Sequence, residues 1–137
     1  MDIFNPDSGR WRGGCACGEV RYDIRGEPLM SLHCQCRQCQ RVTGAGHASQ
    51  FGVRSDAVDM HGTLTLYEMT ADSGHRVSSG FCPRCGSPVL KKSAGHPTLL
   101  FFHAATLDDP ALFSPQRVVW SASKQPWDHV DPALPID

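Results

Sequence analysis

The sequence lacks an excess of charge of either sign, and it lacks any long run of apolar residues. Its 13 Lys and Arg residues nearly balance its 14 Asp and Glu residues, which leaves a net charge of −1. Such a chain has no broad positive field to attract nucleic-acid phosphates or anionic lipids. No segment approaches the apolar length that a membrane-spanning helix needs. We therefore expect neither nucleic acid nor a membrane among its partners.

The N-terminal segment lacks the apolar run of a secretory signal, so we expect a cytoplasmic protein. The length of 137 residues and the hydrophobic content of 40% suit one modest core. The sequence contains no internal repeat and no low-complexity segment. We expect residues 1–10 to form a short tail and residues 11–137 to form a single domain.

The apolar pattern predicts short strands rather than long helices. Residues 19–25 alternate Val, Tyr and Ile with polar residues, the period-two pattern of a half-buried strand. Residues 48–79 carry short apolar groups separated by glycines, which predicts a meander of strands. Residues 98–104 form the most hydrophobic predicted strand, and we expect it at the centre of a sheet. Residues 106–137 hold half of the prolines and predict an irregular wrap with one further strand at 118–120.

Seven cysteines are the most informative feature of the sequence. In a reducing compartment, clustered cysteines indicate metal or redox chemistry rather than structural disulfides. They fall into three short elements: Cys15 and Cys17, then Cys34, Cys36 and Cys39, then Cys82 and Cys85. Such spacings let one turn present two sulfurs to one ion, and zinc accepts soft thiolate ligands in tetrahedral geometry. Iron–sulfur ligation is the main rival, which spacing alone does not exclude.

Two partitions of these cysteines are possible. The simplest joins the two dithiol elements, residues 15–17 and 82–85, into one closed structural site. The central element then forms a three-ligand site, and an open fourth position is typical of catalytic zinc. The competing partition builds a zinc ribbon from Cys36, Cys39, Cys82 and Cys85. The gap between its two halves is more than twice the ~15–20 residues usual for a ribbon, so spacing favours the first partition.

Four ordered segments carry a resemblance to a known family. They are residues 13–22, 33–39, 81–87 and 106–110. Together they resemble the glutathione-dependent formaldehyde-activating enzyme family, which also includes centromere protein V. Residues 120–121 and 126–127 are similar to its C-terminal signature. The resemblance covers nearly the whole chain, from about residue 11 to residue 135.

The resemblance implies a small, zinc-stabilised all-β fold, tent-like in shape and built of packed antiparallel sheets. It implies two Zn²⁺ ions per chain. The structural ligands carried over from the family are Cys15, Cys17, Cys82 and Cys85. The catalytic ligands carried over are Cys34, Cys36 and Cys39. The implied activity is that of a carbon–sulfur lyase, which joins formaldehyde to the thiol of glutathione to give S-(hydroxymethyl)glutathione.

A three-thiolate zinc carries net negative charge, so its natural fourth ligand is a soft thiolate. We therefore expect a small-molecule thiol, glutathione or a similar compound, as the partner. His33 and His47 are candidates for moving the proton that the thiol releases. Arg37 and Arg41 are candidates for pairing with the carboxylates of glutathione.

Three other features have competing interpretations. Residues 108–110, Asp-Asp-Pro, predict a structural turn rather than an acid–base pair, because adjacent side chains on extended chain point apart. Trp120 and Trp127 are candidates to line the pocket, but aromatic residues of a small β domain more often lie in its core. The alternatives to a lyase are a non-catalytic zinc module that binds thiols or a protein, and a thiol–disulfide enzyme using Cys82 and Cys85.

Overall fold

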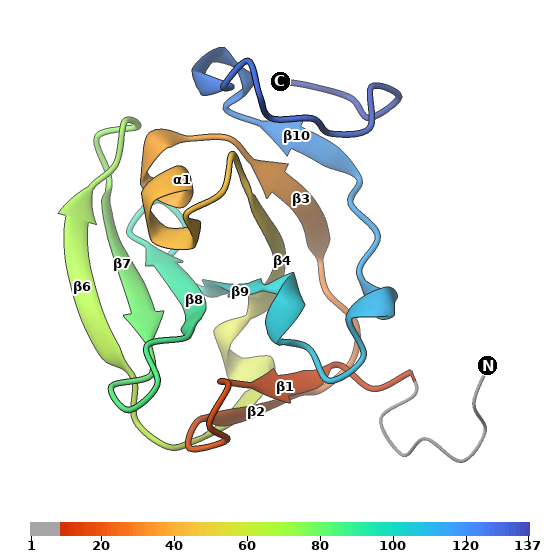
Figure 1. Ribbon diagram of the computed structural model, residues 1–137. Coiled ribbons are helices and arrows are strands. Elements are labelled where there is room, and N and C mark those ends of the chain that lie inside the picture. Colours follow the sequence, from red (N-terminus) through yellow and green to blue (C-terminus); the bar gives the residue numbers. More distant parts are fainter. Residues whose placement is uncertain (1–8) are drawn as a thin grey trace.

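The computed structural model describes residues 9–137, and it is built mainly of two β-sheets. The prediction of a short tail at residues 1–10 falls mostly outside the described residues. The smaller sheet has three antiparallel strands in the order β1-β2-β5 and lies at the bottom of the view in Figure 1. Its strands are β1 (Arg12–Gly14), β2 (Arg21–Ile24) and β5 (Val58–His61). The alternation at residues 19–25 thus correctly predicts a strand.

The larger sheet has seven strands in the order β10-β3-β4-β9-β8-β7-β6. Its strands are β3 (Met30–Cys34), β4 (Ala48–Arg54), β6 (Thr65–Thr70), β7 (Arg76–Phe81), β8 (Pro88–Ser93), β9 (Leu99–His103) and β10 (Arg117–Val119). The hydrophobic β9 is the middle strand, as its sequence predicts. All pairs are antiparallel except β10 with β3, which is parallel. The prediction of antiparallel sheets is therefore confirmed for every pair but this one.

Helical structure is scarce among residues 9–137. The only α-helix in this range is α1 (Arg37–Thr43), which ends at Gly44 in the left-handed conformation with φ of 71°. Glycine takes this conformation without a steric penalty, so Gly44 ends the helix that begins within the central cysteine element. Four single-turn 3₁₀ helices complete the description: η1 (Ser55–Ala57), η2 (Ala104–Thr106), η3 (Pro110–Leu112) and η4 (Ser121–Ser123).

The main core lies between the two sheets. Tyr22 of β2 and Phe51 of β4 both pack on Phe102 of β9, with ring centroids 4.3 and 5.7 Å from it. The Tyr22 hydroxyl and Thr106 Oγ1 form a 2.8 Å hydrogen bond. Gly13 of β1 lies so close to this point that a Cβ there would sit 2.1 Å from the Thr106 carbonyl oxygen. The core therefore requires glycine at the place where the small sheet meets η2.

A second, smaller core lies on the opposite face of the large sheet, beneath α1. Its buried members are Leu32, Cys34, Cys36, Cys39 and Ala48. Side chains of a strand alternate between faces, so β4 serves both cores. Phe51 belongs to the main core, and Ala48 belongs to the smaller one. The central cysteine element is thus part of a packed layer between the helix and the sheet.

The C-terminal segment differs from its prediction in one respect. It wraps the molecule and contributes β10, as the sequence predicts (Figure 1). However, the expectation that Trp120 and Trp127 lie in the core is wrong, because their side chains are 41% and 62% exposed. The Asp-Asp-Pro segment makes structural contacts. Asp108 accepts hydrogen bonds from Arg21 of β2, and Asp109 directly precedes η3.

Candidate metal centres

One group of four cysteines joins two distant parts of the chain. We call it the four-cysteine group, and its members are Cys15, Cys17, Cys82 and Cys85. Their sulfur atoms all lie within 4.8 Å of one another. Two backbone N–H groups donate to these sulfurs, from Val20 to Cys15 at 3.2 Å and from Arg84 to Cys82 at 3.4 Å. Such hydrogen bonds favour the thiolate form, which is the form that binds metal.

The second group has three members, and we call it the three-cysteine group. Cys34 ends β3, Cys36 caps the N-terminus of α1, and Cys39 lies in the first turn of that helix. Their sulfurs also lie within 4.8 Å of one another, and all three residues are buried. The Cys39 backbone N–H donates to the Cys36 sulfur at 3.3 Å. The strand end and the helix start together aim three sulfurs at one point.

The thiols of the three-cysteine group perturb one another strongly. The pKa of Cys36 lies far below its ordinary value, because Cys34 and Cys39 donate hydrogen bonds to its sulfur. The pKa of Cys39 is raised, first by its hydrogen bond with Cys34, then by that with Cys36, and by burial. A divalent cation with soft-ligand preference fits three buried sulfurs of this kind, and zinc is such a cation.

The structure brings the cysteines together in the partition that their spacing favours. Cys36 and Cys39 lie in one group, while Cys82 and Cys85 lie in the other. The competing zinc-ribbon partition is therefore wrong. All seven cysteines are free thiols.

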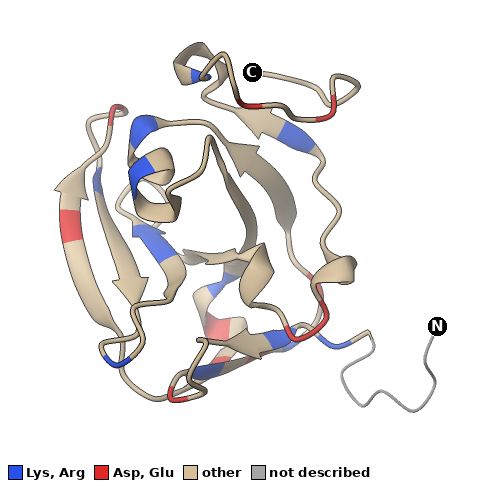
Figure 2. Cartoon of the chain, in the orientation of Figure 1, with Lys and Arg blue, Asp and Glu red and all other residues tan. Residues whose placement is uncertain are grey.

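A small cavity adjoins the three-cysteine group, and we call it the α1 cavity. It has a volume of about 280 Å³, part of it open to solvent. Its exposed lining is mainly apolar, with Val42, Met69 and Val77 among the lining residues. The polar side chains of Gln38, Gln50, Lys91 and His103 lie at its wall beside Cys39. The Lys91 ammonium lies 4.0 Å from the Cys39 sulfur, and the Gln50 amide nitrogen lies 3.9 Å from it. Figure 2 shows basic residues on α1 and on the neighbouring β8, which carries Lys91.

Sequence patterns alone do not identify Lys91 and Gln50 as members of the site. Neither residue lies in a cysteine element, and Lys91 is 52 positions from Cys39. The register of the large sheet brings them together, since Gln50 pairs with His103 and Lys91 pairs with Phe101. The only sequence signal is weak: Gln50 is a polar residue inside the strand meander predicted for residues 48–79.

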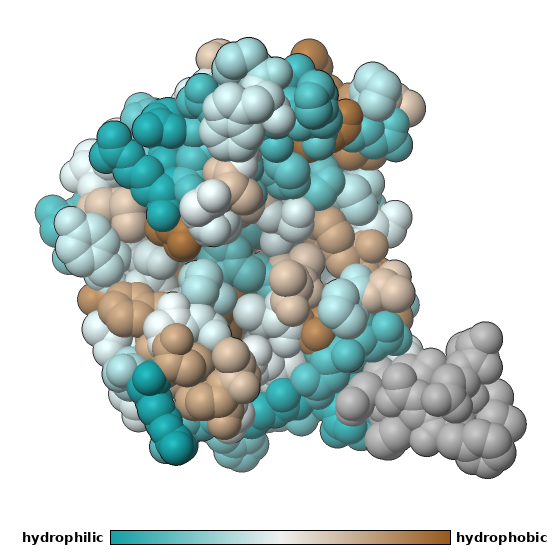
Figure 3. All heavy atoms as spheres, viewed as in Figure 1, coloured by the Kyte–Doolittle hydropathy of each residue, from teal (hydrophilic) through white to brown (hydrophobic). Residues whose placement is uncertain are grey.

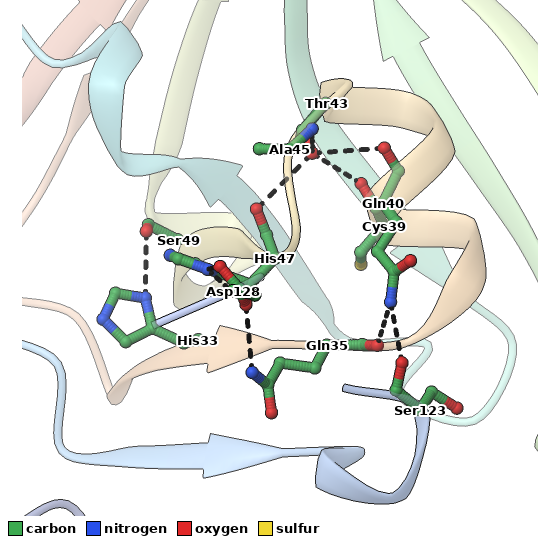
Figure 4. Close-up of polar contacts among 10 residues, drawn as sticks. All are labelled: His33, Gln35, Cys39, Gln40, Thr43, Ala45, His47, Ser49, Ser123 and Asp128. Carbon is green, nitrogen blue, oxygen red and sulfur yellow. Dashed lines mark hydrogen bonds and ion pairs between the residues drawn. The ribbon is translucent and has the colours of Figure 1, made fainter. Parts of the chain in front are cut away.

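The two candidate histidines form a cluster of their own, seen in Figure 4. The ring centroids of His33 and His47 are 4.6 Å apart. The Nδ1 atom of His33 lies 2.9 Å from Ser49 Oγ. Successive residues of a strand point to opposite faces, so His33 points away from the face that carries Cys34. The pKa of His33 is lowered, first by burial and then by the nearby His47.

The second histidine has a carboxylate partner that the sequence does not reveal. His47 Nδ1 lies 2.9 Å from an Asp128 oxygen, and the amide nitrogen of Gln35 donates to the same carboxylate at 3.0 Å (Figure 4). Burial alone raises the pKa of Asp128, but hydrogen bonds from Gln35 and His47 outweigh it and lower the pKa. Gln35 stands between Cys34 and Cys36, so Asp128 helps to hold the chain segment that carries those sulfurs.

The two candidate arginines lie on the outside of α1. Arg37 is exposed and donates a hydrogen bond to Gln40, and Arg41 is exposed in the last turn. Figure 3 shows hydrophilic surface over the helix, with a small hydrophobic patch directly below it. Both guanidinium groups are therefore reachable from solvent at the end of the molecule that holds the three-cysteine group.

The chain is thus a small, mostly antiparallel β protein. Its two cysteine groups could each hold a metal ion. Residues 10–123 match the family described as glutathione-dependent formaldehyde-activating enzyme. The chain belongs to that family.

Comparison with solved structures supports the same fold. A crystal structure of a Rhodobacter sphaeroides protein is similar, with a TM-score of 0.58 and 21% identity, over 92% of this chain and 99% of the other. At that identity the likeness shows the fold alone. A search of curated proteins found no match. Within residues 9–137, no helix has the length and apolar character that crossing a membrane requires.

Proposed function

We propose that this protein is a zinc-dependent carbon–sulfur lyase of the S-(hydroxymethyl)glutathione synthase type, acting on glutathione or a similar thiol adduct. The observation that carries the proposal is the three-cysteine group, whose buried sulfurs adjoin a cavity lined by a lysine and two glutamine side chains. A purely structural site has no need of such a cavity. Membership of the family supports the same reaction class.

The donor sets suggest different roles for the two groups. Four thiolates complete the tetrahedral coordination of zinc, which is typical of a structural site. Three thiolates are one ligand short of that number, which is typical of a catalytic site. When bound there, zinc would supply a Lewis acid that holds a substrate sulfur as its thiolate, below the free-thiol pKa of ~8.5. We propose two zinc ions per chain on this basis.

The residues around the three-cysteine group keep the sulfurs placed and charged. The N–H of Cys39 and the amide of Gln50 donate to sulfur atoms, and the Lys91 ammonium offsets part of the thiolate charge. These contacts come from α1, β4 and β8, so three separate elements fix the group. Preorganised donors of this kind need no rearrangement when a charged sulfur arrives.

The histidines suit a supporting role better than direct proton transfer at sulfur. His33 points away from the face that carries Cys34, and His47 is held by Asp128. Through Asp128, His47 is linked to Gln35 in the segment between Cys34 and Cys36. We propose that His47 positions this segment. We propose that Arg37 and Arg41, exposed on α1, attract the carboxylates of glutathione.

The test is to measure zinc content together with the rate at which glutathione and formaldehyde combine, after subtracting the rate without protein. We expect two zinc ions per wild-type chain and an accelerated reaction. The Cys36→Ser variant should keep one zinc and lose the acceleration. If the wild-type protein holds two zinc ions and binds glutathione without any acceleration, the protein is a thiol-binding zinc module instead.

We propose a cytoplasmic location, because clustered cysteines that serve as metal ligands rather than forming disulfides are typical of a reducing compartment. The test is to fractionate cells and ask whether the protein is found with cytoplasmic markers.

A further inference from the structure

The α1 cavity contains a buried hydrogen-bond acceptor without a partner. Within residues 9–137, two buried side-chain atoms have no hydrogen-bond partner: Gln38 Oε1 and Gln50 Oε1. Both residues line this cavity. Gln50 is only 1% exposed. A buried acceptor that loses its water and gains no partner destabilises the folded protein. Its retention beside the three-cysteine group indicates a ligand that brings a donor.

The orientation of the Gln50 amide follows from its neighbour. Its nitrogen lies 3.9 Å from the Cys39 sulfur. A thiolate accepts hydrogen bonds and donates none, so the N–H side of the amide faces the sulfur. The oxygen then lies on the side of the amide away from Cys39, and Gln50 is one of the residues that line the cavity. Gln50 lies on the interior strand β4, paired with Leu32 on one side and His103 on the other, so the direction of this acceptor is fixed.

Lys91 supplies a complementary donor at the same place. Its ammonium nitrogen lies 4.0 Å from the Cys39 sulfur and 5.2 Å from the centroid of the Phe101 ring. An ammonium group carries three N–H donors. Cys39 is the only hydrogen-bond partner found for it among the described residues. Donors therefore remain for a group inside the cavity.

A hydroxyl group matches this pair, because it donates one hydrogen bond and accepts others. We propose that Gln50 and Lys91 recognise the hydroxyl of a hemithioacetal, the S–CH(R)–OH group that forms when a thiol adds to an aldehyde. This inference rests on the proposed function and adds the residues that recognise the hydroxyl of its substrate. The hydroxyl is two bonds from the sulfur, and both recognising residues contact Cys39. The small volume of the cavity suits this end of the substrate rather than a whole tripeptide.

The proposal predicts discrimination between two ligands of the same shape. S-(hydroxymethyl)glutathione carries a hydroxyl group at the position where S-ethylglutathione carries a methyl group. The ethyl compound leaves Gln50 Oε1 unpaired, so the zinc-loaded wild-type protein should bind it about tenfold or more weakly. The measurement is calorimetric titration with glutathione pre-equilibrated with formaldehyde, with S-ethylglutathione, and with glutathione alone as a reference.

Two variants test the assignment and one serves as control. Gln50→Leu and Lys91→Met should each reduce the preference to about threefold or less. Lys92→Met is the matched control, because Lys92 is exposed beside Lys91 and pairs with Ser78 on the other face of β8; it should keep the full preference. Zinc content and thermal unfolding are measured for every variant. If Gln50→Leu does not fold, the Lys91→Met variant still tests the preference, because Lys91 is only partly buried.

The outcomes separate the two proposals. If the wild-type protein binds both compounds equally, or if Gln50→Leu and Lys91→Met keep the preference with zinc still bound, the recognition proposal is wrong while the proposed lyase function stands. If neither compound binds to the zinc-loaded wild-type protein, the proposed function on glutathione fails, and the hydroxyl assignment fails with it.

Discussion

The imidazole of His47 and the carboxylate of Asp128 form a partly buried pair, with Nδ1 lying 2.9 and 3.0 Å from the two oxygens. The two residues are 81 positions apart. Asp128 also packs against Gly46, where an added Cβ would lie 2.3 Å from the Asp128 Cγ atom. The C-terminal segment is thus fastened to the start of β4 and, through Gln35, to the junction of β3 and α1 that carries the three-cysteine group.

Replacing Asp128 by asparagine should loosen this attachment. The new amide would present a donor to Gln35, which is itself a donor, or leave His47 without its acceptor. We expect a loss of about 1–3 kcal/mol in the free energy of unfolding, measured by urea denaturation with zinc present. Asp131→Asn, an equal charge change at an exposed residue, is the control. Equal stability of the two variants would contradict the positioning role.

His103 should make stability depend on pH. Burial, followed by the charge of Lys91, lowers its pKa from 6.5 to about 4. Between these values the unfolded chain binds more protons than the folded one, so stability rises with pH across this window and levels off above 6.5. The pKa shift corresponds to a loss of about 3 kcal/mol in the free energy of unfolding between pH 7 and pH 4.

His103→Gln isolates this effect from other acid-sensitive groups. Unfolding free energies at pH 7, 6 and 5 should fall less steeply for this variant than for the wild-type protein. His129→Gln, at an exposed histidine, should keep the wild-type slope. Identical slopes for all three proteins would show that His103 does not stay neutral in the folded state.

The main core should be most sensitive at Phe102. This side chain is fully buried and contacts both Tyr22 and Phe51. Phe102→Ala leaves a large cavity between the sheets and should lower stability by about 3–5 kcal/mol, measured by chemical denaturation. Tyr67→Ala, which removes a ring that is 64% exposed, should cost far less. A similar loss for both would mean that the sheets do not pack through Phe102.

The two cysteine groups should respond differently to loss of one sulfur. Cys82→Ser and Cys34→Ser should each reduce metal content from two zinc ions to one. Cys82→Ser should lower the melting temperature more, because the four-cysteine group joins segments 65 residues apart. Metal analysis and thermal unfolding check this prediction. A larger loss from Cys34→Ser would reverse the structural and catalytic roles.

The sequence predicts those features that depend on local spacing. The cysteine partition follows from short elements, the strand β2 from its alternation, and the central place of β9 from its hydrophobicity. Features that depend on long-range register do not follow. The contact of Lys91 with Cys39 requires the pairing of β8 with β9 and of β9 with β4. No local pattern encodes these pairings.

The C-terminal segment shows the same limit. The parallel pairing of β10 with β3 depends on where an irregular segment returns to the sheet. The carboxylate of Asp128 lies 93 positions from its partner Gln35. Aromatic residues usually indicate core, yet Trp120 adopts a positive φ of 59° and is partly exposed. Proline-rich irregular chain has no period from which side-chain direction can be predicted.

The separate placement of the two cysteine groups has a consequence for synthesis on the ribosome. Cys34, Cys36 and Cys39 lie on the adjacent elements β3 and α1, so all three emerge early and close together. Cys15 and Cys17 emerge first but must wait for Cys82 and Cys85. Chains grow from the N-terminus and local contacts form before distant ones. The nascent chain therefore offers a metal ion the three-cysteine group before the four-cysteine group can assemble.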